Sequence, residues 1–164
     1  MTQQALAVDR SLGRLARWLR FLGMDAAWSP NLTDRELSNL VLSGRTAVTR
    51  TRAVAKTLDP DRMVFVTSGD PREQLAQAAR DLGFVLDESR VFSRCLECNR
   101  EVLPMDASEA AGRVPEYVLA TQPRFTRCPS CGRIYWPGTH RDRALAFFRN
   151  ILSQGKDSIE RGTP

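Results

Sequence analysis

The four cysteines of this 164-residue chain occur in two pairs, and this feature constrains the fold more than any other. The pairs are Cys95-Leu-Glu-Cys98 and Cys128-Pro-Ser-Cys131, and 29 residues separate the second cysteine from the third. A two-residue spacer lets both thiolates of a pair reach one tetrahedral ion at about 2.3 Å, and two pairs close its coordination sphere. We therefore expect a structural Zn²⁺ site that organises a zinc ribbon. The alternative is two disulfides, which belong to oxidising compartments.

Two further residues follow the second pair, and neither is needed as a metal ligand. Gly132 follows the pair directly, where a glycine permits the tight backbone turn around sulfur. His140, the single histidine, is not needed as a ligand, and its position fits a surface, core or substrate-contacting role equally.

Upstream of the cysteines, short apolar runs alternate with helical segments. Such alternation predicts βαβ units and an open, mostly parallel sheet with helices on both faces, an α/β fold. The strands are expected near 4–9, 26–28, 45–49 and 63–67, and the helices near 11–23, 33–43, 52–58 and 70–83. We predict an α/β domain over 1–92, a zinc ribbon with a terminal amphipathic helix over 93–154, and a disordered tail over 155–164.

Composition and charge exclude some classes of protein. No apolar run approaches the roughly 18 residues of a membrane span, and the N-terminus lacks the features of a secretory signal. We expect a cytoplasmic protein without membrane contact, and the oligomeric state stays open. The 24 Lys and Arg residues exceed the 19 acidic residues, and only Lys56 and Lys156 are lysine. Arginine binds phosphate through two hydrogen bonds, which favours a polyanion partner, although a GC-rich genome also favours arginine codons.

The first predicted helix separates its charges from its apolar residues. At 100° per residue, the arginines fall on one face and the leucines on the other. The arginines are Arg10, Arg14, Arg17 and Arg20, and the leucines are Leu12, Leu15, Leu19 and Leu22. The cationic row is a candidate surface for RNA phosphates; the alternative is a solvated helix face.

Several carboxylates follow the predicted strands. Ligands of an open parallel sheet bind at the carboxyl ends of its strands, where Asp9, Asp34 and Asp70 are expected. Clustered carboxylates without a histidine suit Mg²⁺ or Mn²⁺. Asp70 precedes a proline and is also a good helix cap, and Glu36 completes a capping box with Thr33, so we interpret Glu36 as structural.

Taken in order, these segments resemble the mut-seven C-terminal RNase domain family over about residues 5–142. The segments are "VDRSLGRLARWLRFLG", "TDREL", "TRTRA", "SGDPREQL", "RCLECN" and "RCPSCGRIYWPGTH". The resemblance implies a PIN-like nuclease fold followed by a zinc ribbon, with Mg²⁺ or Mn²⁺ held by acidic residues for RNA cleavage. It also implies that Asp9 takes the first acidic position and Asp34 the second.

One residue departs from the family pattern. Where the family has Thr-Arg-Asp-Arg, this chain has Thr49-Arg50-Thr51-Arg52. A threonine hydroxyl is a poorer ligand for a hard cation than a carboxylate, so Thr51 weakens the expected catalytic centre. Asp70 is a candidate substitute, whereas Asp59 and Asp61 are predicted in a turn one helix away. Arg50 and Arg52 join the candidate RNA-binding arginines.

These observations leave two main functions. The first is a metal-dependent ribonuclease whose activity Thr51 reduces. The second is a catalytically inactive RNA-binding or ribosome-associated zinc-ribbon module. A third, a zinc-ribbon adaptor for proteins, predicts no salt-sensitive RNA affinity.

Overall fold

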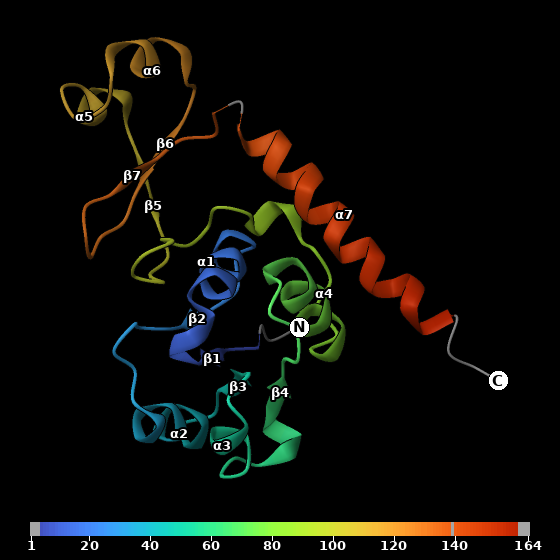
Figure 1. The fold of residues 1–164 in the computed structure, drawn as a ribbon. Helices are drawn as coiled ribbons and strands as arrows, with labels where there is room; N and C mark the ends of the chain where they lie inside the picture. Colours follow the sequence, from blue (N-terminus) through green and yellow to red (C-terminus); the bar gives the residue numbers. More distant parts are fainter. Residues whose placement is uncertain (1–3, 139, 161–164) are drawn as a thin grey trace.

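The computed structural model describes residues 4–138 and 140–160, while the side chains of His140 and of 154–160 lie outside the described part. Four short strands form a parallel sheet in the order β2-β1-β3-β4 (Figure 1). They are β1 (Leu6–Val8), β2 (Ala26–Ala27), β3 (Thr46–Thr49) and β4 (Met63–Phe65). The predicted parallel sheet is confirmed.

Helices cover both faces of this sheet. Successive strand residues point to opposite faces, so Leu6 and Val8 pack with α1 and α4, while Ala7 packs with α2 and α3. The helices are α1 (Gly13–Phe21), α2 (Asp34–Leu42), α3 (Arg52–Ala55) and α4 (Pro71–Asp81). Three 3-10 turns lie in the segments between these elements or after α4: η1 (Arg10–Leu12), η2 (Pro60–Arg62) and η3 (Glu88–Arg90).

The cysteine-containing segment folds around a second, antiparallel sheet in the order β5-β6-β7. Its strands are β5 (Leu103–Met105), β6 (Phe125–Arg127) and β7 (Ile134–Tyr135), and two short helices, α5 (Ala107–Ala110) and α6 (Glu116–Thr121), lie between the first two. A small core of Met105, Ala110, Val118 and Phe125 fills this unit. The sheet and its adjoining cysteine loops are compatible with the predicted zinc ribbon.

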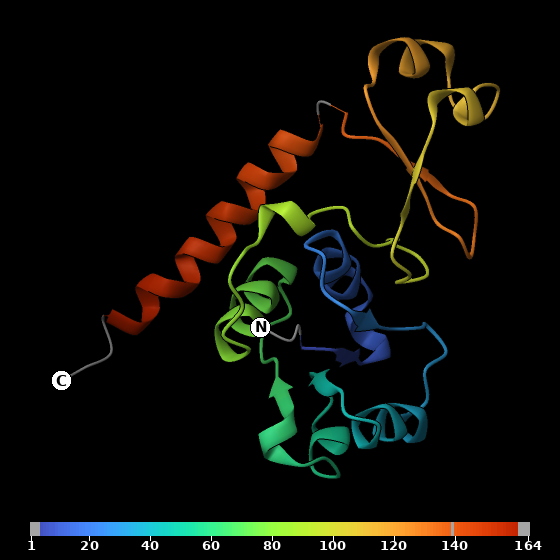
Figure 2. The same cartoon turned by 180° about the vertical axis from the view of Figure 1, so that it is seen from behind.

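The last helix, α7 (His140–Glu160), returns to the α/β unit and runs beside α4 (Figures 1 and 2). Its buried residues Leu145, Phe148 and Ile151 join the same hydrophobic cluster as α1 and α4. The helix continues to Glu160, where the sequence predicted a disordered tail from residue 155, and 161–164 lie outside the described residues. The predicted division at residue 92 stays a prediction, although the packing groups α7 with the α/β unit.

No helix in the described part of the chain is both long and apolar enough to cross a membrane.

Candidate functional site

Asp9 lies at the carboxyl end of β1, and its side chain is only 5% exposed. One carboxylate oxygen, Oδ1, accepts a hydrogen bond from the amide of Ser11 (2.9 Å), which caps η1. The other, Oδ2, accepts from the hydroxyls of Thr49 (2.6 Å) and Thr51 (2.7 Å). The amide of Thr51 in turn donates to the Thr49 hydroxyl (3.0 Å). We call Asp9, Thr49 and Thr51 the Asp9 site.

The environment of Asp9 favours the ionised carboxylate. Burial raises the pKa of Asp9, but hydrogen bonds from the Ser11 amide and from the Thr49, Thr51 and Ser11 hydroxyls together lower it below its ordinary value. Asp9 therefore carries a negative charge at neutral pH.

The topology places the Asp9 site where ligands bind in open α/β sheets. The chain leaves β1 to form β2 on one side, then crosses to form β3 on the other, so strand order reverses beside Asp9. Three exposed arginines adjoin the site in sequence: Arg10 after Asp9, and Arg50 and Arg52 around Thr51. The Arg50 guanidinium reaches the loop after β4, since its Nη2 lies 3.9 Å from the position of a Cβ on Gly69.

The other predicted acids lie on neighbouring elements. Asp34 is the exposed first residue of α2, and the Thr33–Glu36 capping box next to it is confirmed. Asp70 caps α4 by accepting from the Arg72 amide (2.6 Å). Both follow a strand of the sheet, yet no three carboxylates among the described residues converge closely enough to share an ion. The structure thus brings together Asp9 and Thr51, and leaves the roles of Asp34 and Asp70 as predictions.

The oxygen atoms of the Asp9 site are of the type that binds a hard divalent ion, but they carry little negative charge. Carboxylate and hydroxyl oxygens are suitable ligands for Mg²⁺ and Mn²⁺. The site supplies only one negative charge, however, and the Ser11 amide and the Thr49 and Thr51 hydroxyls all donate to that carboxylate. Any ion held there is expected to bind weakly.

The predicted row of arginines on α1 is interrupted by one residue. Arg10 and Arg14 are exposed, and Arg17 is exposed but pairs with Glu97 (3.1 Å). Arg20 is 2% exposed, and its guanidinium donates to four backbone carbonyls, those of Ala26, Trp28, Leu96 and Glu97. The prediction that Arg20 binds RNA is therefore wrong, because α1 packs against the ribbon on that side and buries the residue.

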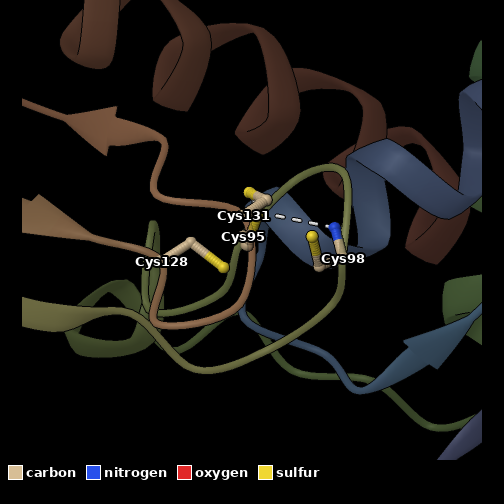
Figure 3. A group of neighbouring side chains, drawn as sticks. All are labelled: Cys95, Cys98, Cys128 and Cys131. Atoms are coloured by element: carbon tan, nitrogen blue, oxygen red, sulfur yellow. Dashed lines mark hydrogen bonds between the residues drawn. The ribbon is translucent and has the colours of Figure 1, made fainter.

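The four cysteines form the second candidate site, with all four sulfur atoms within 4.8 Å of one another (Figure 3). All four are free thiols, so the structure does not show the two-disulfide alternative. They lie on two similar turns, the first knuckle (residues 95–100) and the second knuckle (128–133). In each, the first cysteine amide donates to the carbonyl five residues later, that of Arg100 or Arg133 (both 2.8 Å).

Each knuckle needs one residue in the left-handed backbone conformation. Gly132 has a φ of 72° in the second knuckle, which confirms the predicted role of the glycine. Asn99 has a φ of 63° at the same place in the first knuckle. Asparagine tolerates this conformation better than most residues, so the two knuckles differ in side chain but not in backbone.

The environment lowers the pKa of Cys95 but raises the pKa of Cys98 and of Cys128. The Tyr135 hydroxyl lies 3.1 Å from Cys95 Sγ, a contact that the sequence analysis missed. Burial raises the pKa of Cys95, but the hydrogen bond with Tyr135 and those from the Cys98 and Glu97 amides lower it overall, to about 7. Four sulfur donors in one small cluster fit a closed, structural metal site. The predicted candidate His140 lies outside the described side chains.

One comparison with known proteins identifies a family for the chain. The family model of the Mut7-C RNAse domain matches residues 4–148, a range that contains both the Asp9 site and the four cysteines. No curated protein and no solved structure matches the chain. Because the family model spans most of the chain, the protein belongs to the Mut7-C RNAse domain family.

Proposed function

We propose that the protein is a metal-dependent ribonuclease that hydrolyses RNA phosphodiesters slowly at the Asp9 site. The observation that carries the proposal is the 2.7 Å hydrogen bond between Thr51 Oγ1 and Asp9 Oδ2. Thr51 stands where the family resemblance implies an aspartate, and it contacts Asp9, which takes the first acidic position. In this proposal the Asp9 site therefore corresponds to a centre with two carboxylates, but it has one negative charge fewer.

The residues of the Asp9 site have distinct roles in this proposal. Asp9 and the hydroxyls of Thr49 and Thr51 would hold Mg²⁺ or Mn²⁺, with Asp34 or Asp70 as further acids. When bound, such an ion polarises the phosphodiester and lowers the pKa of an attacking water. Arg10, Arg50 and Arg52 hold the flanking phosphates through charge-assisted hydrogen bonds and so position the RNA.

A second candidate function is RNA binding without cleavage. It is favoured because Asp9 already accepts hydrogen bonds from the Ser11 amide and from the Thr49 and Thr51 hydroxyls, so its charge is compensated by the protein itself. The same arginines would then hold RNA beside the Asp9 site, and the protein would not hydrolyse it.

RNA cleavage by the full chain in Mn²⁺, Mg²⁺ or EDTA separates the two functions. We expect slow cleavage by the wild type that EDTA and Asp9→Asn abolish. Thr51→Asp should raise both Mn²⁺ affinity and the cleavage rate, by on the order of tenfold, because a second carboxylate adds a charged ligand. Thr51→Asn is the matched control, since it supplies an oxygen without charge and should leave both values unchanged.

Three outcomes decide between the candidates. Loss of cleavage in EDTA and in Asp9→Asn supports the ribonuclease. Salt-sensitive RNA binding without cleavage, even by Thr51→Asp, selects the binding module. Absence of RNA affinity in every variant contradicts both.

We also propose that the metal of the four cysteines is zinc and that the protein works in the cytoplasm, where thiols stay reduced. Elemental analysis of protein purified without chelator should give one zinc per chain. Mass spectrometry should show four alkylatable thiols after zinc removal. A zinc content near zero, or two disulfides, would overturn this assignment.

A further inference from the structure

The first knuckle covers the outer edge of the parallel sheet. β2 is an edge strand. The amide and carbonyl of Ala26 point away from β1, toward the side on which a further strand would pair. The Ala26 amide donates to Asn99 Oδ1 (3.0 Å), and its carbonyl accepts from Arg20 Nε (2.9 Å). One side chain of the knuckle and one of α1 thus satisfy polar groups that an open edge leaves unpaired.

Arg20 also binds the backbone between the two cysteines of the first knuckle. Its Nη1 donates to the carbonyls of Leu96 (2.9 Å) and Glu97 (2.7 Å), and its Nη2 to that of Trp28 (3.1 Å). A single buried guanidinium therefore connects the metal-binding loop with the sheet edge and with the segment that follows β2.

The cysteine centre also provides a partner for the charge of Arg20. The hydrogen bonds that its guanidinium donates to Ala26, Leu96, Glu97 and Trp28 all go to neutral carbonyls. Burial lowers the pKa of Arg20, and the negative charges of Cys95, Glu97 and Cys98 act in the opposite direction. Four thiolates around a divalent ion leave two net negative charges, and a buried guanidinium is stabilised by such a neighbour.

Asn99 extends the connection beyond β2. Its Nδ2 donates to Asp25 Oδ1 (2.7 Å), and Asp25 in turn pairs with Arg45 (2.7 Å). Arg45 Nη1 also donates to the carbonyl of Leu6 in β1 (3.1 Å). The second knuckle forms the same turn with Gly132, so the turn does not require the asparagine side chain, and the side chain serves the contact with the sheet.

We propose that metal binding by the four cysteines orders the β2 edge of the α/β unit, through Arg20 and Asn99. Loss of the metal frees the first knuckle and removes its hydrogen bonds to Asp25, Ala26 and Arg20. The effect extends to the segment directly after Asp9, because Trp28 Nε1 donates to the carbonyl of Arg10 (3.1 Å) and its ring packs against Gly13. This inference does not depend on the protein being a ribonuclease.

Amide hydrogen exchange of the full chain tests the coupling directly. We expect a peptide covering 24–30 to exchange at least about tenfold faster after zinc is removed with a chelator. A peptide covering 45–49, in the central strand β3, should keep its protection and shows that the α/β core remains folded. Unchanged exchange of 24–30 while the knuckle peptides open would overturn the proposal.

Two reciprocal substitutions separate the contact from the turn. Asn99→Gly keeps the left-handed turn but removes the hydrogen bonds to Ala26 and Asp25. Gly132→Asn places the same side chain on the second knuckle, where an added Cβ meets only Arg113 Nη2 at 4.0 Å. We expect Asn99→Gly to weaken zinc affinity about tenfold, measured by competition with a chromophoric chelator, and to speed exchange of 24–30 in zinc-loaded protein.

Gly132→Asn should leave both measurements at the wild-type value. Equal effects of the two substitutions would show that only the knuckle turns matter, and would refute the role of the contact. Wild-type behaviour of Asn99→Gly would refute it as well.

Discussion

At the scale of single residues, Asp25 connects stability to pH. Burial raises the pKa of Asp25, but hydrogen bonds from Arg45 and Asn99 and the charges of Arg45 and Arg94 lower it overall, below the ordinary aspartate value of 3.8. A carboxyl group whose pKa is lower in the folded state stabilises the fold above its unfolded pKa. That contribution is lost as the pH falls through about 3.8 and on through the folded pKa.

Asp25→Asn should therefore lower the free energy of unfolding at pH 7 by about 1–2 kcal/mol and flatten its fall between pH 5 and pH 3. Urea denaturation at several pH values measures both effects. Asp142→Asn is the matched control, because its side chain is 90% exposed and should leave the profile unchanged. An Asp25→Asn profile parallel to the wild type would contradict this assignment.

The residues of the Asp9 site were only partly predictable. Asp9 and Thr51 were expected at one edge because both follow strands of a parallel sheet, and they are in contact. Thr49 was not singled out, although its hydroxyl bonds the same oxygen, because a buried threonine at the end of a strand has the same sequence signal as any β-branched core residue. Arg20 was assigned to the wrong role because helical periodicity gives an angle around α1 and does not reveal what packs there.

At the scale of elements, η1 and α1 present Arg10 and Arg14 to solvent together with Arg17. Each phosphate contact on single-stranded RNA contributes about −0.7 to the slope of log affinity against log salt. Replacing Arg14 and Arg17 together with alanine should make that slope less steep by about 0.7–1.4. RNA affinity measured by fluorescence anisotropy over a range of salt concentrations gives the slope.

The control for this experiment is Arg80→Ala, which removes an exposed arginine near the C-terminal end of α4, the end opposite the Asp70 cap. It should change neither the slope nor the fold. If the double variant also keeps the wild-type slope, the exposed face of α1 is a solvated surface and does not contact RNA.

Whether a segment forms a strand or a long helix was easier to predict than the elements against which it packs. The alternation of apolar runs with capped helices located all four strands of the parallel sheet, because each apolar run has its own turn and cap signals. The short helices α5 and α6 of the ribbon were missed, since segments of four to six residues carry little periodicity. The partner of α7 was also missed, because an apolar face predicts burial without indicating which surface covers it.

At the scale of the whole molecule, α7 holds the chain together after the ribbon. Phe148, 4% exposed, lies with its ring centroid 4.9 Å from that of Phe21 and 5.6 Å from that of Trp18. The helix thus completes the core of the α/β unit with residues that follow both cysteine pairs in sequence. The ribbon is connected to this core at both of its ends.

Phe148→Ala should consequently lower the free energy of unfolding by about 3–5 kcal/mol, since it removes a buried aromatic ring and leaves a cavity in the main core. For a chain of this length the melting temperature should fall by roughly 10 °C. Zinc content should stay at the wild-type value, because Phe148 belongs to the α/β cluster and not to the ribbon core. Tyr117→Ala, in which the lost ring is 71% exposed on α6, is the matched control and should change the melting temperature little. A loss below about 1 kcal/mol for Phe148→Ala would mean that α7 does not complete the core, and that the α/β unit is stable without the segment that follows the ribbon.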